Sequence, residues 1–282
     1  MAGTHDTVRV SFESRVVCYI QCFRRYADGT KSNSATATGF HWADGSTLYF
    51  ITNWHNVTGR NPQSNEPNGS FTPTHLHIWF IEMQNRADET SRYAKFIGKE
   101  IALYDDSGNK RWIEHPNGRF VDIVAIKIDN YDWKDSIYTI NSKPTLPDFK
   151  PMCGDDCYIV GYPDGFKGPG GMPIWKRASI ATEPELNYQK SPLFLADSLT
   201  RPGMSGAPVF SRVHGLWGQE GAGISIGGKH PTILGHLHKF IGIYAGREGN
   251  ESEGFQLARI WKSSVIKEII ANSSLPEHTH ID

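Results

Sequence analysis

The chain has 282 residues, enough for one large or two small domains with a sizeable core. Its 29 basic and 30 acidic residues give a net charge of −1, so charge provides no case for binding nucleic acid or an anionic membrane. With 28 glycines, 16 prolines and many aromatic residues, the composition favours a turn-rich β protein over a helical one.

The first half reads as a series of short strands separated by turns. Residues 1–8 have the composition of a loose tail, and residues 8–12 alternate between apolar and polar side chains. Further strands are expected at 15–23, 35–42, 48–53, 75–83, 93–104, 110–115 and 121–128. A polar loop rich in proline and asparagine is expected at 60–74.

The second half repeats this pattern after a polar linker at 131–150, so we expect domains at 9–135 and 136–272. Strands are expected at 157–162, 174–181, 193–198, from 209 onward, 240–245 and 255–259. The glycine-rich segment 215–230 predicts a surface loop. Helical spacing of apolar residues predicts a helix at 261–271, followed by a frayed tail at 273–282.

The sequence predicts neither a secretion signal nor a membrane span. No basic region followed by an apolar run occurs near the N-terminus, and no run of about 18 apolar residues occurs anywhere. The cysteines form two pairs, Cys18 with Cys22 and Cys153 with Cys157, each with a spacing unlike that of most zinc sites. We expect free thiols in a reducing compartment; a zinc site joining the pairs is the alternative.

Residues 200–210 read T-R-P-G-M-S-G-A-P-V-F, with a serine between two glycines. A serine hydroxyl becomes a nucleophile only beside a base and a pocket of N–H donors. Gly203 can turn the backbone so that its N–H and that of Ser205 point the same way, while Gly206 leaves room for a substrate backbone. The alternative is a turn in which Ser205 only hydrogen-bonds its own loop.

His55 and Asp122 are the candidate base and its orienting carboxylate. His55 directly follows an apolar strand, and Asp122 opens an apolar strand where an unpaired carboxylate would be costly. The alternatives are a turn histidine and a strand-start cap. Together with Ser205, these residues follow the order His, Asp, Ser, each at a strand edge, which favours a catalytic triad.

The segments T-N-W-H-N-V, V-D-I-V-A-I-K-I and P-G-M-S-G-A-P-V resemble the three catalytic motifs of trypsin-like serine peptidases. They are most similar to the bacterial, disulfide-poor branch that includes the high-temperature-requirement proteases. The resemblance implies an all-β fold of two antiparallel Greek-key β-barrels with the active site in the cleft between them, and a C-terminal α-helix. It also implies that Ser205 is the nucleophile, His55 the general base and acid, and Asp122 the carboxylate that orients His55. The N–H groups of Gly203 and Ser205 match the oxyanion hole.

The chain departs from the digestive members of this family at Met204, where they carry an aspartate that pairs with a freshly cut N-terminus. We therefore expect activity without zymogen cleavage. No cysteine flanks His55, and we expect no peptide-binding PDZ module after the helix. The glycosylation sequon that starts at Asn56 lies beside the expected active site, where a glycan would block substrate. These features predict a bacterial cytoplasmic enzyme.

The resemblance also indicates the walls of the specificity pocket. Leu199 and Thr200 would form one side, and Tyr244, Ala245 and Gly246 the other. Because Leu199 stands where trypsin has an aspartate, we expect an uncharged P1 side chain. If Glu251 or Glu253 turned inward, the pocket would instead select lysine or arginine.

No cofactor and no metal are expected. The pairs His75 with His77 and His236 with His238 have chelating spacing but lack an evident third ligand. The sequence thus predicts a serine endopeptidase that cleaves polypeptides through an acyl-enzyme. The alternatives are a non-catalytic or partner-activated binding scaffold on the same fold, and an esterase. Nothing in the sequence identifies the substrate protein or the oligomeric state.

Overall fold

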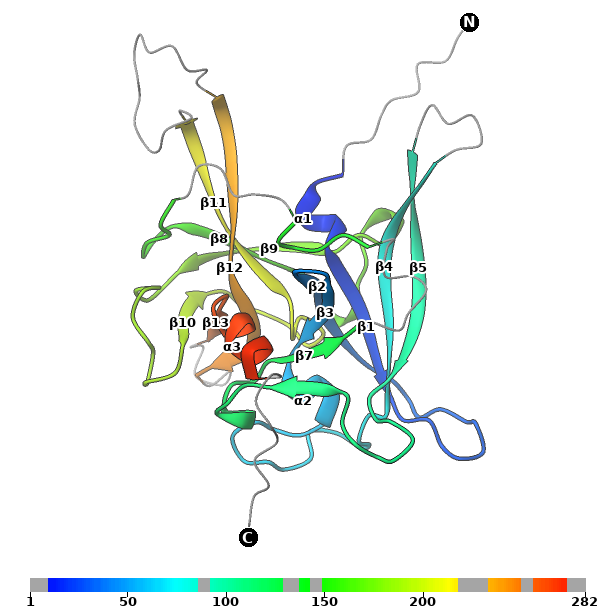
Figure 1. Ribbon diagram of the computed structural model, residues 1–282. Helices are drawn as coiled ribbons and strands as arrows, with labels where there is room; N and C mark the ends of the chain where they lie inside the picture. The colour runs from blue at the N-terminus through cyan, green and yellow to red at the C-terminus, as the bar shows by residue number, and fades with distance from the viewer. Residues whose placement is uncertain are drawn as a thin grey trace, which may run out of the picture.

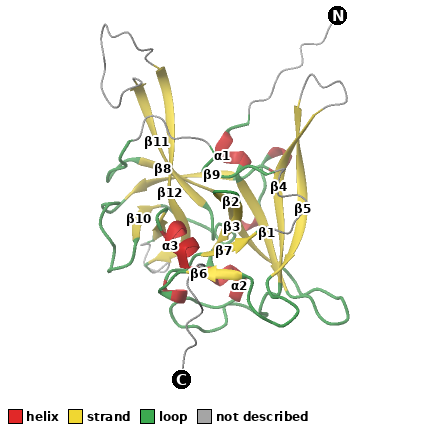
Figure 2. Ribbon diagram, in the orientation of Figure 1, coloured by secondary structure: helices red, strands yellow, loops and turns green. Residues whose placement is uncertain are grey.

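The computed structural model describes residues 10–85, 92–128, 137–142, 149–217, 233–249 and 256–272. Strands dominate this part of the chain, and the few helices are short (Figures 1 and 2). The strands form two bodies, a seven-stranded sheet and a closed six-stranded barrel. Within the described ranges, no helix has the length and apolar character needed to cross a membrane.

The first sheet is antiparallel throughout, in the order β5-β4-β1-β2-β3-β7-β6. Its strands are β1 Val17–Phe23, β2 Ala35–Asp44, β3 Thr47–Thr52, β4 His75–Asn85, β5 Arg92–Ala102, β6 Trp112–Glu114 and β7 Val124–Lys127. Alternate residues of each strand face opposite sides. On β1, for example, Ile20 packs into the first half's own core while Tyr19 faces the second half.

The barrel is also antiparallel and closes in the order β10-β13-β12-β11-β8-β9. Its strands are β8 Asp156–Gly161, β9 Ile174–Ile180, β10 Leu193–Asp197, β11 Pro208–Trp217, β12 Ile233–Glu248 and β13 Leu257–Lys262. Buried side chains such as Ile159, Phe194 and Ile260 fill its interior.

A third apolar cluster joins the two bodies. Phe40 of β2 packs against Phe240 of β12 with ring centroids 5.3 Å apart. Tyr19 meets Tyr162, just after β8, edge to face at 5.2 Å. Burial of this surface stabilises the halves against each other and fixes the region between them, where the candidate site lies.

The helices are α1 Phe12–Arg15, α2 Trp54–Thr58 and α3 Val265–Asn272, with 3-10 turns at Gly118–Phe120, Pro163–Gly165 and Pro169–Gly171. Helix α3 follows the barrel but returns to the first half. There its Glu268 carboxylate lies 2.9 Å from Nε2 of the buried His115, and Asn272 donates to the carbonyl of Glu114. This link ties the C-terminal helix to the edge strand β6.

The expected fold class is confirmed, because the structure is mostly strand, contains a closed barrel and a second large sheet, and ends its described part in a helix. The first half is a seven-stranded sheet rather than the closed barrel that the resemblance implied. The expected domain boundary between residues 135 and 136 falls outside the described residues.

Three local expectations are wrong. The expected strand at 8–12 overlaps helix α1, whose first turn Ser11 caps by accepting a hydrogen bond from the Ser14 N–H; residues 1–9 lie outside the described ranges. The expected helix at 261–271 starts late, because Trp261 is buried in β13 between two neighbouring strands and only Val265 begins the helix.

The third error concerns only the start of the expected loop at 215–230, since residues 215–217 belong to a strand. Strand β11 continues to Trp217 and β12 begins at Ile233, paired in continuous register, so the flanks of this segment form the long arm seen in Figure 1. Backbone hydrogen bonds between the two strands hold this arm together. Its residues do not alternate between apolar and polar, so the sequence pattern gave no sign of a strand. Residues 218–232 lie outside the described part.

All four cysteines are free, as the sequence predicted. Burial raises the pKa of the Cys22 and Cys157 thiols to about 12, whereas Cys153 is exposed. In the described part of the chain, no three histidine, cysteine, aspartate or glutamate side chains gather to hold a metal ion.

Candidate functional site

His55 lies in the short helix α2, which begins as soon as strand β3 ends. The apolar strand carries the chain to the boundary between the two bodies, and the helix turns the imidazole toward the second half. Gly59 ends the helix in a left-handed conformation and donates its N–H to the His55 carbonyl at 2.9 Å. This bond fixes the carbonyl end of the His55 backbone.

Asp122 holds His55 with both carboxylate oxygens. Oδ2 lies 2.7 Å from His55 Nδ1, and Oδ1 accepts the His55 backbone N–H at 3.0 Å. Because a carboxylate only accepts hydrogen bonds, this geometry favours the imidazole tautomer that has its proton on Nδ1 and its lone pair on Nε2. Asp122 is 2% exposed, so water hardly competes for it.

The backbone around Asp122 is also tied to the histidine helix. Asn53, directly before α2, donates its side-chain amide to the Asp122 carbonyl at 2.7 Å. The sequence suggested that Asp122 opens the strand, but it lies two residues before β7 begins. Both neighbours, Val121 and Ile123, are buried, which leaves the carboxylate facing His55.

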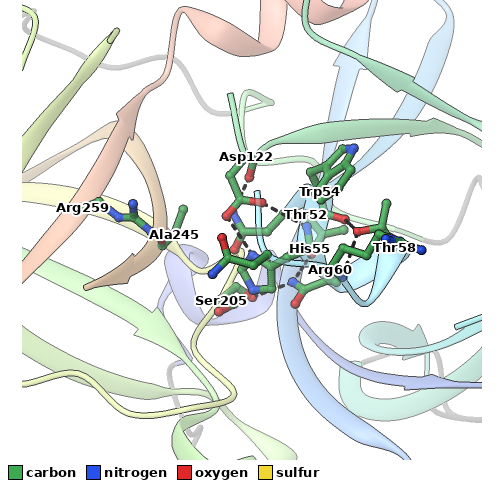
Figure 3. Close-up of polar contacts among 12 residues, drawn as sticks. Thr52, Trp54, His55, Thr58, Arg60, Asp122, Ser205, Ala245 and Arg259 are labelled. Carbon is green, nitrogen blue, oxygen red and sulfur yellow. Dashed lines mark hydrogen bonds and ion pairs between the residues drawn. The ribbon is translucent and has the colours of Figure 1, made fainter. Parts of the chain in front are cut away.

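Ser205 lies in the loop between β10 and β11, on the second half. Ser205 and His55 line one cleft of about 200 Å³, formed by residues from both halves. The other lining residues are Cys22, Ala35, Thr36, Asn56, Gly59, Asn68, Gly69, Phe71, Pro73, Pro202 and Gly203. Figure 3 shows Asp122, His55 and Ser205 gathered in one place, from segments that lie far apart in the sequence.

The backbone of the serine loop leaves two N–H groups unused. Among the described residues, the N–H groups of Gly203 and Ser205 have no acceptor, whereas those of Met204, Gly206 and Ala207 donate to backbone carbonyls. An unused pair of N–H groups beside a nucleophile is the arrangement that stabilises an oxyanion.

The direction of these two N–H groups is set by the carbonyls of the same peptide units. In a trans peptide, the N–H points opposite to the preceding C=O. The Pro202 carbonyl accepts from the Asp164 N–H at 2.7 Å, and the Met204 carbonyl accepts from the Ala207 N–H at 2.8 Å. Rotating either peptide would break one of these bonds.

The two glycines of the loop fill different roles. Gly203 has φ +85°, and a Cβ there would lie 2.4 Å from the Tyr162 carbonyl oxygen. Gly206 has φ +87°, and a Cβ there would lie 2.1 Å from the Thr38 carbonyl oxygen. The expectation that Gly206 leaves room for substrate is therefore corrected, since the space it leaves is occupied by Thr38 of the first half.

Met204 is fully buried in the barrel core, packed in the cluster that contains Ile159 and Val209. An apolar side chain thus holds the centre of the loop at the position where digestive members of the family carry an aspartate.

The predicted pocket residues lie outside the cleft that contains Ser205. Leu199 is 56% exposed, while Thr200 and Tyr244 are buried and their hydroxyl oxygens lie 2.6 Å apart. Ala245 is buried beside them, and its carbonyl accepts a hydrogen bond from Arg259 at 3.1 Å (Figure 3). Gly246 follows in a left-handed conformation with φ +88°. Burial raises the pKa of the Tyr244 hydroxyl.

Sequence reasoning missed the side-chain role of Asn56. Its amide donates to the Thr52 hydroxyl at 2.9 Å and to the Ser205 carbonyl at 3.2 Å, and Asn56 is buried. The only signal in the sequence was its place next to His55. The sequon is indeed beside the candidate site, and its nitrogen is already engaged.

Comparison with known proteins identifies the family of the chain. A crystal structure of Rv3671c from M. tuberculosis H37Rv, a serine-to-alanine mutant in an inactive form, is similar over 94% of this chain and 90% of that one, with 12% identity and a TM-score of 0.45. No curated protein matches the chain. Residues 37–217, well over half of the chain, match the family described as trypsin-like peptidase domain. The chain therefore belongs to the trypsin-like peptidase family.

Proposed function

We propose that this protein is a serine endopeptidase in which Ser205 is the nucleophile, His55 the general base and acid, and Asp122 the residue that orients His55. One observation carries the proposal: a buried carboxylate holds both the ring Nδ1–H and the backbone N–H of a histidine that shares a cleft with Ser205. Burying a carboxylate costs free energy unless it is paired, and here its partner is a histidine whose tautomer it sets.

The first half of the reaction forms an acyl-enzyme. Ser205 Oγ attacks the peptide carbonyl carbon while His55 Nε2 takes the hydroxyl proton, and Asp122 stabilises the resulting imidazolium. The carbonyl oxygen becomes an oxyanion, which accepts hydrogen bonds from the Gly203 and Ser205 N–H groups. When the C–N bond breaks, His55 gives its proton to the leaving amine and the acyl group stays on Ser205.

The second half releases the acyl group. A water molecule gives a proton to His55 Nε2 and attacks the ester carbonyl, and the same two N–H groups hold the new oxyanion. The C–O bond to Ser205 then breaks, and Oγ regains its proton from His55. The free enzyme is restored without any further group.

Turnover of a peptide and of an ester by the Ser205→Ala variant tests this function. We expect peptide turnover to fall by about 10⁶-fold, since the three residues act as a unit. Ser211→Ala, a buried serine on the adjoining strand β11, is the matched control and should keep activity. Equal peptide turnover by Ser205→Ala and wild type contradicts the triad. Ester turnover without peptide turnover supports an esterase instead.

We further propose an uncharged P1 side chain. The exposed Leu199 and the closed hydroxyl pair of Thr200 and Tyr244 offer no carboxylate to a cationic side chain among the described residues of this wall. Glu251 and Glu253, the alternative selectors, lie outside the described part of the chain. A library of fluorogenic peptides that varies P1 decides between them, and a strong arginine or lysine preference contradicts the uncharged assignment.

A further inference from the structure

A residue of the first half contacts the serine loop through both its backbone N–H and its side-chain hydroxyl. Thr38 lies in strand β2 and is fully buried. Its N–H donates to the Ser205 carbonyl at 2.9 Å, and its hydroxyl donates to the Gly203 carbonyl at 2.8 Å. The same hydroxyl oxygen accepts the Tyr162 N–H at 3.2 Å. Its own carbonyl accepts from the Thr52 hydroxyl at 2.9 Å.

These contacts complete the hydrogen bonding of the loop. Within residues 202–205, the Pro202 and Met204 carbonyls accept from the second half's own backbone, and the Gly203 and Ser205 carbonyls accept from Thr38. Each of the four peptide units is thereby fixed in rotation. Only the two N–H groups that face the proposed oxyanion have no acceptor among the described residues.

The Thr38 hydroxyl acts at the weakest point of this loop. Gly203 has a positive φ and no side chain, so the peptides on both sides of it rotate more easily than elsewhere. Asp164 holds the peptide before Gly203, and the Thr38 hydroxyl holds the peptide after it. Without that hydroxyl, the peptide between Gly203 and Met204 loses the one hydrogen bond to the first half that the described residues give it.

We propose that Thr38 is a positioning residue that keeps the N–H groups of Gly203 and Ser205 directed into the cleft. It orders the oxyanion hole from the first half of the molecule, in a chain whose Met204 offers no carboxylate to an N-terminal ammonium. This inference rests on the proposed peptidase function for its effect on catalysis. The contact itself spans the interface between the two halves.

The test compares Thr38→Val with Thr38→Ser. Valine keeps the shape and removes the hydroxyl, and serine keeps the hydroxyl. We expect kcat of Thr38→Val to fall between about 10- and 100-fold with KM within about twofold of wild type, because one oxyanion donor is worth about 10²–10³ in kcat and here is misaligned rather than lost. Thr38→Ser should stay within about threefold of wild-type kcat.

Thr74→Val is the matched control. The Thr74 hydroxyl accepts the Arg25 N–H at 2.9 Å and bonds His75 at 2.9 Å, so this variant also loses two hydrogen bonds, neither of them to the serine loop. It should keep wild-type kcat. A Thr38→Val enzyme with wild-type kcat overturns the proposal, and so does a Thr38→Ser enzyme as slow as Thr38→Val.

A readout that needs no activity separates this proposal from the function it rests on. Hydrogen exchange of the peptide that contains residues 203–207 should be faster in Thr38→Val than in wild type, and unchanged in Thr74→Val. Unchanged exchange in Thr38→Val overturns the positioning role. A folded wild type without turnover contradicts the peptidase function, and the exchange comparison then still decides whether Thr38 holds the loop.

Discussion

Asp122 is a buried carboxylate whose surroundings are all arranged around one histidine. Its two oxygens accept from two nitrogens of His55, and Asn53 fixes its backbone. The geometry constrains both the position and the tautomer of the imidazole. An aspartate that only capped the following strand would instead accept hydrogen bonds from the N–H groups of that strand.

The Asp122→Asn variant tests this assignment at the scale of one residue. The amide keeps the shape of the side chain but presents an N–H to His55 Nδ1, which favours the wrong tautomer. We expect kcat to fall by about 10⁴-fold with little loss of stability. Asp156→Asn, which breaks an exposed ion pair with Arg177, is the control. A loss below about tenfold in peptide turnover contradicts the orienting role.

At the scale of elements, the loop between β10 and β11 is held by packing as well as by hydrogen bonds. Met204 is buried in the barrel core and carries the residues on either side of it to the cleft. Digestive members of the family order this loop with an ion pair that forms after zymogen cleavage. Here the packing of Met204 takes that place, and it is present as soon as the barrel folds. This supports the expectation of activity without zymogen cleavage.

Truncating Met204 measures this packing. Met204→Ala should lower the free energy of unfolding by about 2–5 kcal/mol, because it leaves a cavity in a closely packed core. Met152→Ala, at a methionine that is 64% exposed, should change it by less than about 0.5 kcal/mol. Denaturant titration of both variants provides the comparison. Equal effects of the two substitutions contradict the role of Met204 in anchoring the loop.

Residue patterns predicted most strands and all three proposed catalytic positions, because each lies at the edge of a strand with a local signature. They failed where the structure depends on contacts distant in sequence. Thr38 and Gly203 are 165 residues apart, and nothing in A-T-A-T-G-F reveals that this hydroxyl meets the serine loop. The arm of β11 and β12 was not predicted because glycines and histidines interrupt the alternation of apolar and polar residues that indicates a strand.

At the scale of the whole molecule, the proposed site exists only where the two halves meet. His55 and Asp122 come from the sheet, Ser205 comes from the barrel, and the shared apolar cluster around Phe40 and Phe240 holds them together. Thr38 and Asn56 add polar contacts across the same boundary. The proposed function therefore depends on one claim, that this junction activates Ser205.

Labelling with a fluorophosphonate probe tests that claim most directly, since the probe reacts with a serine only when a base and an oxyanion hole activate it. The full chain and the Ser205→Ala variant are treated in parallel, without prior proteolysis, and the adduct is located by mass spectrometry. We expect one adduct on Ser205 in the wild type and none in the variant. A folded wild-type protein that remains unlabelled, or one labelled equally in both forms, would contradict it.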